Sequence, residues 1–398
     1  MSDLVAAVHR LCEETAPGIV WFDSTRAPHA GVSRLFAHPE RVLTETVDGF
    51  VELPSGQPVD DPVAWMVDTP EELWLAGFLG FEFAWSLDDV RARLRRAQTP
   101  ALWVGRYERP AASGSNACAR DFVAPLSAPA LDVPADRYRD NVRRCIEAIA
   151  AGELFEVNYT ERWEARYRGS PFDLYRAMRE RSIGAYFAFL QTDDFAICSV
   201  SPEQFLGVSD GRCVARPIKG TRARGETAAE DAEQIADLLG SDKDRAENVM
   251  IVDLMRNDLA RVCTASTVAA TRICDLETFA GVHHLVSTVE GELDPDIDPV
   301  VAMVSCFPPG SVTGAPKLRA VELIAELEAT PRGPYTGTMF YRAPDGTLES
   351  SVLIRTATVV GERVWYGAGG AIVSDSDPEA ELREAWAKVS PILRAAEL

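Results

Sequence analysis

Four carboxylates fall into two pairs with helical spacing. Glu381 and Glu384 are three residues apart near the C-terminus, and Asp244 and Glu247 are three apart in segment 242–262, which we predict to be a helix. Side chains three apart share one helix face. Two such faces brought together could hold a hard divalent ion such as Mg²⁺, which prefers oxygen ligands and keeps waters that a substrate can replace. The spacing also fits two solvated helix faces, because acidic pairs are common on exposed helices.

An acid and an amine, Glu203 and Lys219, lie on either side of a predicted hairpin. The turn signal is Ser-Asp-Gly at 209–211, so Glu203 should end one strand and Lys219 should end its partner or a neighbouring strand. Gly220 and Thr221 come next, and such small residues let a ligand approach the backbone. The segment therefore predicts a carboxyl group and an amine at one site. The alternative is a surface lysine at a strand end.

Lysine is rare in this chain. Of 40 basic residues only four are lysine, and all lie in the second half of the sequence: Lys219, Lys243, Lys317 and Lys388. Arginine is the default cation here, so a lysine suggests chemistry that a guanidinium cannot perform, such as losing a proton to become a nucleophile.

A segment rich in glycine and small hydroxyl residues, CFPPGSVTGAPKLRA at 306–320, precedes a helix that we expect to begin near Pro316. The free N–H groups at such an N-terminus could receive an anion. The later run GAGGAI, at 367–372, is not a dinucleotide fingerprint, because no G-x-G-x-x-G opens a helix after it.

Composition narrows the class of protein. A net charge of −21 over 398 residues argues against nucleic-acid binding, which needs a basic surface. No apolar run approaches 18 residues and the N-terminus lacks the pattern of a signal peptide, so we expect neither a membrane span nor secretion. The eight cysteines are scattered without a C-x-x-C pair, which indicates reduced thiols and a cytoplasmic location. Any metal must be held by carboxylates.

The chain divides into three regions by composition. We predict a sheet-containing region over 1–115, with a helix near 70–85, then a connection rich in Ala, Pro and Ser over 116–134, and a catalytic region over 135–398. Strand patterns alternate with helices without a regular βαβ order. The prediction is an α+β protein: a large intertwined fold of two packed, mainly antiparallel sheets with helices outside.

Taken together, the motifs resemble the chorismate-utilising enzymes, a family that includes anthranilate, aminodeoxychorismate, isochorismate and salicylate synthases. The resemblance runs from about residue 136 to 393. It is carried by SPEQF, PIKGTRARG, KDRAENVMIVDLMRNDLARV, VHHLVS, PPGSVTGAPK, SVLIRTA and GAGGAIVSDSDPEAELREAWAK. An earlier segment, VWFDST, is similar to the N-terminal strand of the amine-forming members.

The resemblance implies a role for each matching position. Glu247 and Glu384 would be Mg²⁺ ligands, with Asp244 and Glu381 holding coordinated waters. The carboxylates of chorismate would be bound by Tyr335, Arg355, Gly369 and Lys388. Thr221 and His284 would line the ring, and Glu203 would be the general acid that protonates the departing 4-hydroxyl.

The residue at 219 distinguishes members of the family. Aminodeoxychorismate synthases carry PIKGT, as here, whereas the other synthases generally carry alanine in place of the lysine. The resemblance implies that Lys219 attacks C2 of the ring with loss of the 4-hydroxyl, and that ammonia then attacks C4 and displaces the lysine. Because attack needs a neutral amine, we expect desolvation or a cationic neighbour to lower the pKa of Lys219.

Two features bear on the alternatives. Glu156 stands where amine-forming members usually show glutamine and where isochorismate and salicylate synthases show a lysine, so a water-adding enzyme is disfavoured.

No G-x-C-x-G nucleophile setting surrounds any cysteine. We therefore expect ammonia from a separate glutamine amidotransferase subunit. The main alternatives are an anthranilate or 2-amino-2-deoxyisochorismate synthase component, and a catalytically silent chorismate-binding relative.

Overall fold

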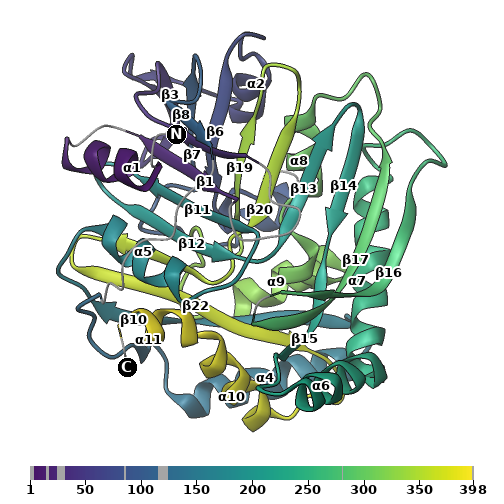
Figure 1. Ribbon diagram of the computed structural model, residues 1–398. Coiled ribbons are helices and arrows are strands. Elements are labelled where there is room, and N and C mark those ends of the chain that lie inside the picture. Colours follow the sequence, from purple (N-terminus) through teal and green to yellow (C-terminus); the bar gives the residue numbers. More distant parts are fainter. Residues whose placement is uncertain are drawn as a thin grey trace.

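The fold is built on two large antiparallel sheets (Figure 1). The computed structural model describes residues 4–14, 18–24, 32–84, 87–114, 124–279 and 281–396. Every strand pairing in this part of the chain is antiparallel, and helices cover the outer faces. The predicted α+β class with two packed sheets is confirmed. Among these residues no helix is long and apolar enough to cross a membrane.

The first sheet has ten strands. In spatial order they are β18 (Gly314–Ala315), β10 (Glu156–Arg166), β22 (Arg363–Ile372), β21 (Thr356–Val360), β12 (Ala196–Ser201), β11 (Tyr186–Gln191), β1 (Ile19–Asp23), β2 (Ser33–Phe36) and β8 (Ala112–Gly114), with β9 (Ala130–Leu131) beside β10.

The second sheet has twelve strands. In spatial order they are β15 (Ile218–Ala223), β17 (Val282–Glu292), β14 (Arg212–Arg216), β13 (Gln204–Ser209), β20 (Leu348–Val352), β19 (Thr338–Arg342), β6 (Trp74–Leu79), β7 (Leu102–Tyr107), β3 (Arg41–Thr46), β4 (Gly49–Leu53) and β5 (Gln57–Pro58), with β16 (Ala269–Thr278) beside β17.

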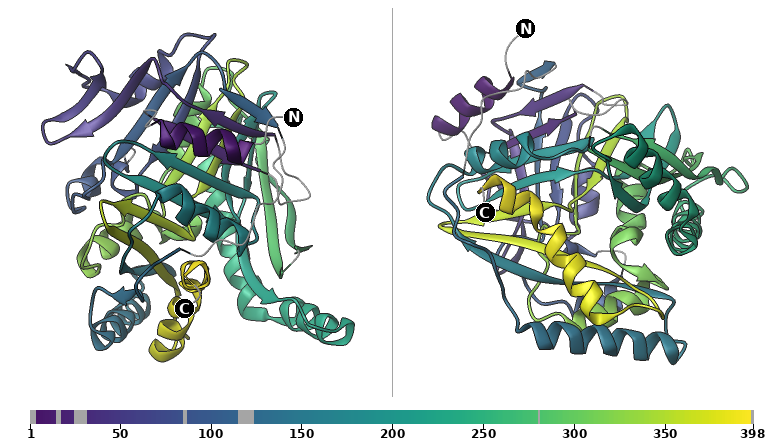
Figure 2. Two further views of the ribbon diagram at one scale, coloured as in Figure 1. Left: turned by 60° about the vertical axis from the view of Figure 1, so that its left-hand side comes forward. Right: turned by 60° about the horizontal axis from the view of Figure 1, so that its bottom comes forward.

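Each sheet buries its outer face under helices. Against the first sheet pack α1 (Leu4–Glu13), α4 (Ala135–Ala150), α5 (Pro171–Glu180), α9 (Lys317–Leu327), α10 (Pro378–Lys388) and α11 (Ser390–Ala395). Against the second pack α2 (Pro62–Val67), α7 (Asp242–Leu259) and α8 (Pro299–Cys306). The remaining helical segments are η1 (Phe81–Phe83), α3 (Asp88–Arg91), α6 (Ala228–Gly240) and η2 (Gly310–Val312). Figure 2 shows α4 and α10 side by side.

A third core, between the sheets, contains aromatic and aliphatic side chains such as Phe22, Phe78 and Met339. Strands from 1–115 contribute to both sheets: β1 pairs with β11, and β6 pairs with β19. The division at 116–134 stays a prediction, and residues 116–123 of that connection lie outside the described part of the chain.

The helix predicted near 70–85 is wrong. Residues Trp74–Leu79 form β6, which lies between β7 and β19 in the second sheet, and only the short turn η1 follows it. A short apolar run fits a buried strand as well as a buried helix, and the pairing partners are distant in sequence.

The helices that carry the predicted acids have clear local signals. Ser241 caps α7 by accepting from Asp244 N, and Asp377 caps α10 by accepting from Ala380 N. The C-terminal segment forms two helices, α10 and α11, and Pro391 lies in the first turn of the second.

Candidate active site

Lys219 lies where β10, β15 and α7 meet. Its Nζ forms ion pairs with Glu156 Oε1 at 3.0 Å and with Glu247 Oε1 at 2.5 Å. The Lys219 side chain is only 10% exposed, and that of Glu156 is fully buried. The lysine is therefore directed into the molecule, and the surface-lysine alternative does not hold.

The charge state of Lys219 differs from our expectation. Burial alone would lower the pKa of this amine, but the carboxylates of Glu156 and Glu247 outweigh it and raise the pKa above its usual range. The predicted lowering by desolvation or a cationic neighbour is thus wrong in this arrangement. Burial raises the pKa of Glu156, an effect that the Lys219 charge opposes. Lys219 is a cation here and must lose a proton before it can attack.

Glu203 lies directly before β13 and is buried. Its Oε1 accepts a hydrogen bond of 2.5 Å from the Ser311 hydroxyl. Burial raises the pKa of Glu203 to about 7, against the opposing effects of Ser311 and the charges of Lys219 and Arg355. A carboxyl group with this pKa can donate a proton near neutrality.

Ser311 is a site contact that reasoning from the sequence missed. It belongs to the 306–320 segment, for which the sequence predicts an anion-binding helix start. In the structure this segment holds Glu203 through Ser311 and continues as β18 along the edge of β10. The small hydroxyl residues beside its glycines were the available signal.

Thr221 and His284 are register partners on β15 and β17. The Thr221 hydroxyl and His284 Nδ1 are 2.8 Å apart. Burial, assisted by the charge of Arg355, lowers the pKa of His284 to about 3, so the imidazole is neutral. A neutral imidazole is suited to contact an uncharged part of a substrate.

Arg355 presents a buried guanidinium to the site. Its backbone has a φ of 51°, and its Nη1 donates to Ile183 O at 3.5 Å. Burial lowers the pKa of this guanidinium, and within the described residues no carboxylate forms an ion pair with it. Positive φ is costly for a non-glycine residue and clusters at functional sites. A buried cation without a carboxylate partner suits an anionic ligand.

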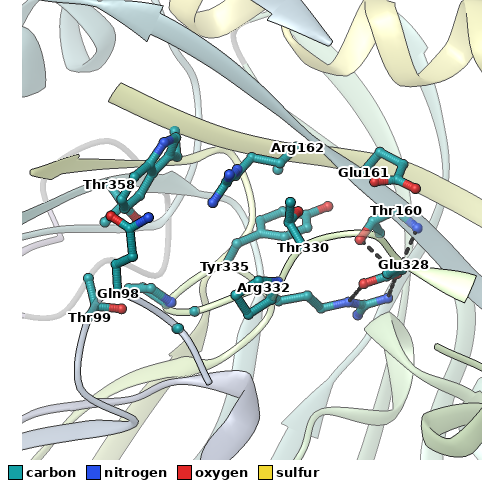
Figure 3. A pocket seen from close by; sticks show the side chains of 16 residues that line it. Gln98, Thr99, Thr160, Glu161, Arg162, Glu328, Thr330, Arg332, Tyr335 and Thr358 are labelled. Atoms are coloured by element: carbon teal, nitrogen blue, oxygen red, sulfur yellow. Dashed lines mark hydrogen bonds and ion pairs between the residues drawn. The ribbon is translucent and has the colours of Figure 1, made fainter. Parts of the chain in front are cut away.

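Tyr335 packs its ring against β22 at Gly367. A Cβ added at 367 would lie 2.2 Å from Tyr335 Cδ1, so only glycine allows this contact. Tyr335 also lines a cavity with the loops 97–99 and 330–335, and Figure 3 shows its ring at the centre of that cavity.

Lys388 connects α10 to β22. Its Nζ donates to Gly369 O at 2.8 Å and pairs with Glu384 Oε1 at 2.7 Å. The neighbouring acid, Glu381, accepts from Ser376 Oγ at 2.7 Å. A Cβ added at Gly370 would lie 3.0 Å from Glu381 Oε2 and 3.6 Å from Glu384 Oε1, so both acids face the glycines of β22.

Three lysines stabilise the ionised carboxylate of Glu384 on α10. Burial by itself would raise the pKa of Glu384, but Lys388, Lys243 and Lys219 together hold it below its usual value. The charge of Lys219, held by Glu247, thus reaches the carboxylate on the opposite helix. Asp244 on α7 pairs with Arg222 at 3.1 Å.

The donor set matches what Mg²⁺ takes from proteins. Within the described residues no group of three or more His, Cys, Asp or Glu side chains converges to hold a metal by itself. Mg²⁺ is commonly bound through one or two carboxylates, with waters and substrate oxygens completing the shell. Glu247 and Glu384, one from each helix, fit that pattern. Both are paired with lysines that a divalent cation would have to displace.

Comparison with known proteins identifies the family of this chain. Residues 52–394 match the family model of chorismate binding enzymes. The chain is 45% identical over 260 residues to an aminodeoxychorismate synthase of Streptomyces griseus, covering 65% of this chain and 36% of that protein. It is 40% identical over 267 residues to anthranilate synthase component 1 of Thermus thermophilus, covering 67% and 58%.

A solved structure agrees over nearly the whole chain. Anthranilate synthase component I from Streptococcus pneumoniae superposes with a TM-score of 0.80 at 26% identity, covering 92% of this chain and 93% of that one. The chain belongs to the family of chorismate binding enzymes. It spans about a third and about three fifths of the lengths of these two curated relatives.

Proposed function

We propose that this protein is the aminating component of an aminodeoxychorismate synthase, which replaces the 4-hydroxyl of chorismate with an amino group. The observation that supports this is the buried Lys219, held between Glu156 and Glu247 beside a protonatable Glu203. The relative from Streptomyces griseus, which carries this name, supports the same reading.

The proposed reaction uses the residues as follows. Lys219 first gives a proton to a contacting carboxylate, and Glu156, whose pKa burial raises, is suited to take it. The amine then bonds to C2 of the ring while the C4–O bond breaks, and Glu203 supplies the proton with which the hydroxyl leaves as water. Ammonia next bonds to C4 and the C2–N bond to Lys219 breaks. Two substitutions replace one difficult one.

Substrate positioning falls to the other residues. We propose that the carboxylates of the substrate are bound by Arg355, Tyr335, Lys388 and the backbone at Gly369. Thr221 and His284 would line the ring of the substrate. Mg²⁺, held by Glu247 and Glu384 with waters on Asp244 and Glu381, would stabilise charge developing on the ring carboxylate.

Ammonia would come from a separate glutamine amidotransferase subunit. Two relatives are named as component 1 or I, which supports a second component. We therefore expect the purified chain to use ammonium salts but not glutamine. Glutamine-dependent turnover by the chain alone would contradict this. The cytoplasm remains the expected location.

An anthranilate synthase component is the second candidate, because relatives of that name match about as well. Product analysis separates the two. The chain is incubated with chorismate, Mg²⁺ and ¹⁵N-ammonium, and NMR locates the new C–N bond. We expect nitrogen at C4 and a loss of about 10³-fold or more in rate for Lys219→Ala, about 4 kcal/mol of barrier. Fluorescent anthranilate with full activity in the variant would reject the proposal. Arg256→Ala, whose guanidinium pairs with Asp253 on the exposed face of α7, is the control.

A further inference from the structure

Residues of the proposed site stand on three segments that are far apart in the sequence. Ser311, which donates to Glu203, lies in η2, and Tyr335 lies in the loop before β19. Glu156, which pairs with Lys219, begins β10. A reaction that uses groups from all three segments requires them to keep a fixed spacing, because small displacements of reacting groups cost rate.

The side chain of Arg332 contacts all three segments. Only 2% of this side chain is exposed, and its guanidinium lies over the Phe81 ring at 4.5 Å. Its five N–H groups make five hydrogen bonds, and their acceptors are Glu328 Oε1, Glu328 Oε2, Val312 O, Thr336 Oγ1 and Asn158 O. Every donor of this buried cation is therefore used inside the protein.

Glu328 neutralises Arg332 and fixes the plane of its guanidinium. The carboxylate accepts from Arg332 Nε at 2.9 Å and from Nη2 at 2.6 Å, which is a bidentate pair. It also accepts from Thr160 N and Oγ1 at 3.0 Å, so the pair is attached to β10 (Figure 3). Because a guanidinium is planar, fixing Nε and Nη2 also sets the direction of Nη1.

Nη1 of Arg332 contacts the segments that carry Ser311 and Tyr335. It donates to Val312 O, the carbonyl directly after Ser311, at 2.9 Å. It also donates to Thr336 Oγ1 at 3.2 Å, and this hydroxyl donates to Tyr335 O at 2.6 Å. One nitrogen atom therefore holds the segment that contacts the proton donor and the segment that carries the proposed carboxylate-binding tyrosine.

Nη2 of Arg332 contacts the third segment, β10. It donates to Asn158 O at 2.6 Å. Asn158 is two residues after Glu156 on this strand, so the two side chains point to the same face. The side chain of Asn158 also donates to Val312 O at 3.1 Å. β10 and η2 are therefore joined both directly and through the guanidinium.

We propose that Arg332 is a positioning residue, which holds Tyr335 and Ser311 at the spacing that substrate binding and proton donation require. It acts through these residues and not on the substrate. The role of Ser311 rests on the proposed function, whereas the role of Tyr335 requires only that the chain binds chorismate. A lysine cannot replace Arg332, because an ammonium has three donors for these five acceptors.

The test is Arg332→Lys, which keeps the positive charge beside Glu328 and leaves at least two acceptors without a donor. We expect the KM for chorismate to rise about tenfold or more, because Tyr335 is no longer held in place. Displacement of Ser311 from Glu203 should also raise the pKa of that carboxyl group. The pH at which activity falls on the alkaline side should then be about one unit higher than in the native chain.

A double variant separates positioning from a general loss of packing. Ser311→Ala removes the same contact to Glu203 that Arg332→Lys is expected to disturb. The two changes together should therefore give the pH shift of Ser311→Ala alone, and not the sum of the two shifts. The charged groups that face Glu203, Lys219 and Arg355, are the same in all these variants. Additive pH shifts would overturn the link to Ser311.

The matched control is Arg179→Lys. Arg179 on α5 is also a buried arginine paired with a carboxylate, that of Asp23 on β1. This variant should lose thermal stability without a change in the KM for chorismate or in the pH profile. An unchanged KM and an unchanged pH profile in folded Arg332→Lys would overturn the proposal.

A second variant serves if circular dichroism shows that Arg332→Lys does not fold. Thr336→Val keeps the β-branched shape and removes only the hydroxyl between Arg332 and Tyr335. We expect it to raise the KM for chorismate about threefold or more and to leave the pH profile unchanged. An unchanged KM in this variant would refute the inference. A chain that forms anthranilate but shows these KM changes would reject the proposed function and retain the positioning role of Arg332.

Discussion

Replacing Ser311 with alanine removes a hydroxyl that donates to Glu203 Oε1 at 2.5 Å in a buried setting. A hydrogen bond to a charged group contributes about 1.5–3 kcal/mol, and about 1.4 kcal/mol corresponds to one pKa unit. The bond favours the ionised carboxylate, so its loss should raise the pKa of Glu203 by about one to two. From about 7 in the native protein, the new value is about 8–9.

The sign of the activity change follows from the role of Glu203. If Glu203 must be protonated to donate to the departing hydroxyl, activity falls as pH rises through its pKa. In the pH–activity profile of Ser311→Ala, the falling limb, where activity decreases with rising pH, should therefore lie about one to two pH units higher than in the native chain. The assay is the initial rate of chorismate consumption from pH 5.5 to 9.5 at saturating Mg²⁺. The ratio of variant to native rates is the measured quantity, because the titration of ammonium affects both proteins equally.

A control separates this effect from a general loss of packing. Ser350 is also a buried serine, but its hydroxyl donates to Leu206 O and not to a carboxyl group. Ser350→Ala should leave the position of the limb unchanged, and Ser311→Thr, which keeps a hydroxyl, should restore it. A falling limb at the same pH in Ser311→Ala and the native chain would refute the reasoning that Glu203 is the proton donor.

Three further outcomes are expected. Glu384→Ala should lower Mg²⁺-dependent turnover by more than the ~10–100-fold typical of an outer-shell partner, with an unchanged circular dichroism spectrum; full activity would place the ion elsewhere. Arg355→Lys should raise the KM for chorismate by about 10- to 100-fold, because an ammonium cannot reproduce a planar guanidinium, and isothermal titration with a substrate analogue checks it. Burial raises the pKa of Glu349 from 4.5 to about 7, so the folded state binds more protons than the unfolded state in that window. The free energy of unfolding should therefore fall, by up to about 3 kcal/mol, as the pH rises between these two pKa values. Denaturant unfolding at pH 4.5 and 8 should show a smaller difference for Glu349→Gln than for the native chain.

Local patterns in the sequence were enough for the elements that carry the acids. The spacing in α7 and α10, with their capping residues Ser241 and Asp377, depends only on contacts within one helix turn. The same holds for the hairpin of β13 and β14, whose turn residues are adjacent in the chain. The resemblance of the motifs then indicated the family, which the match over residues 52–394 confirms.

Only the tertiary structure determines which side chains from distant segments contact one another at the site, and how these contacts set their charge states. Lys219 meets Glu156 and Glu247 from two other elements, and their carboxylates raise the pKa of this buried amine, which desolvation alone would have lowered. Ser311 reaches Glu203 across 108 residues of sequence. No periodicity within a segment reports such contacts, because they depend on which strands and helices become neighbours when the two sheets pack together. The types of the reactive groups could therefore be predicted from the sequence, but their charge states could not.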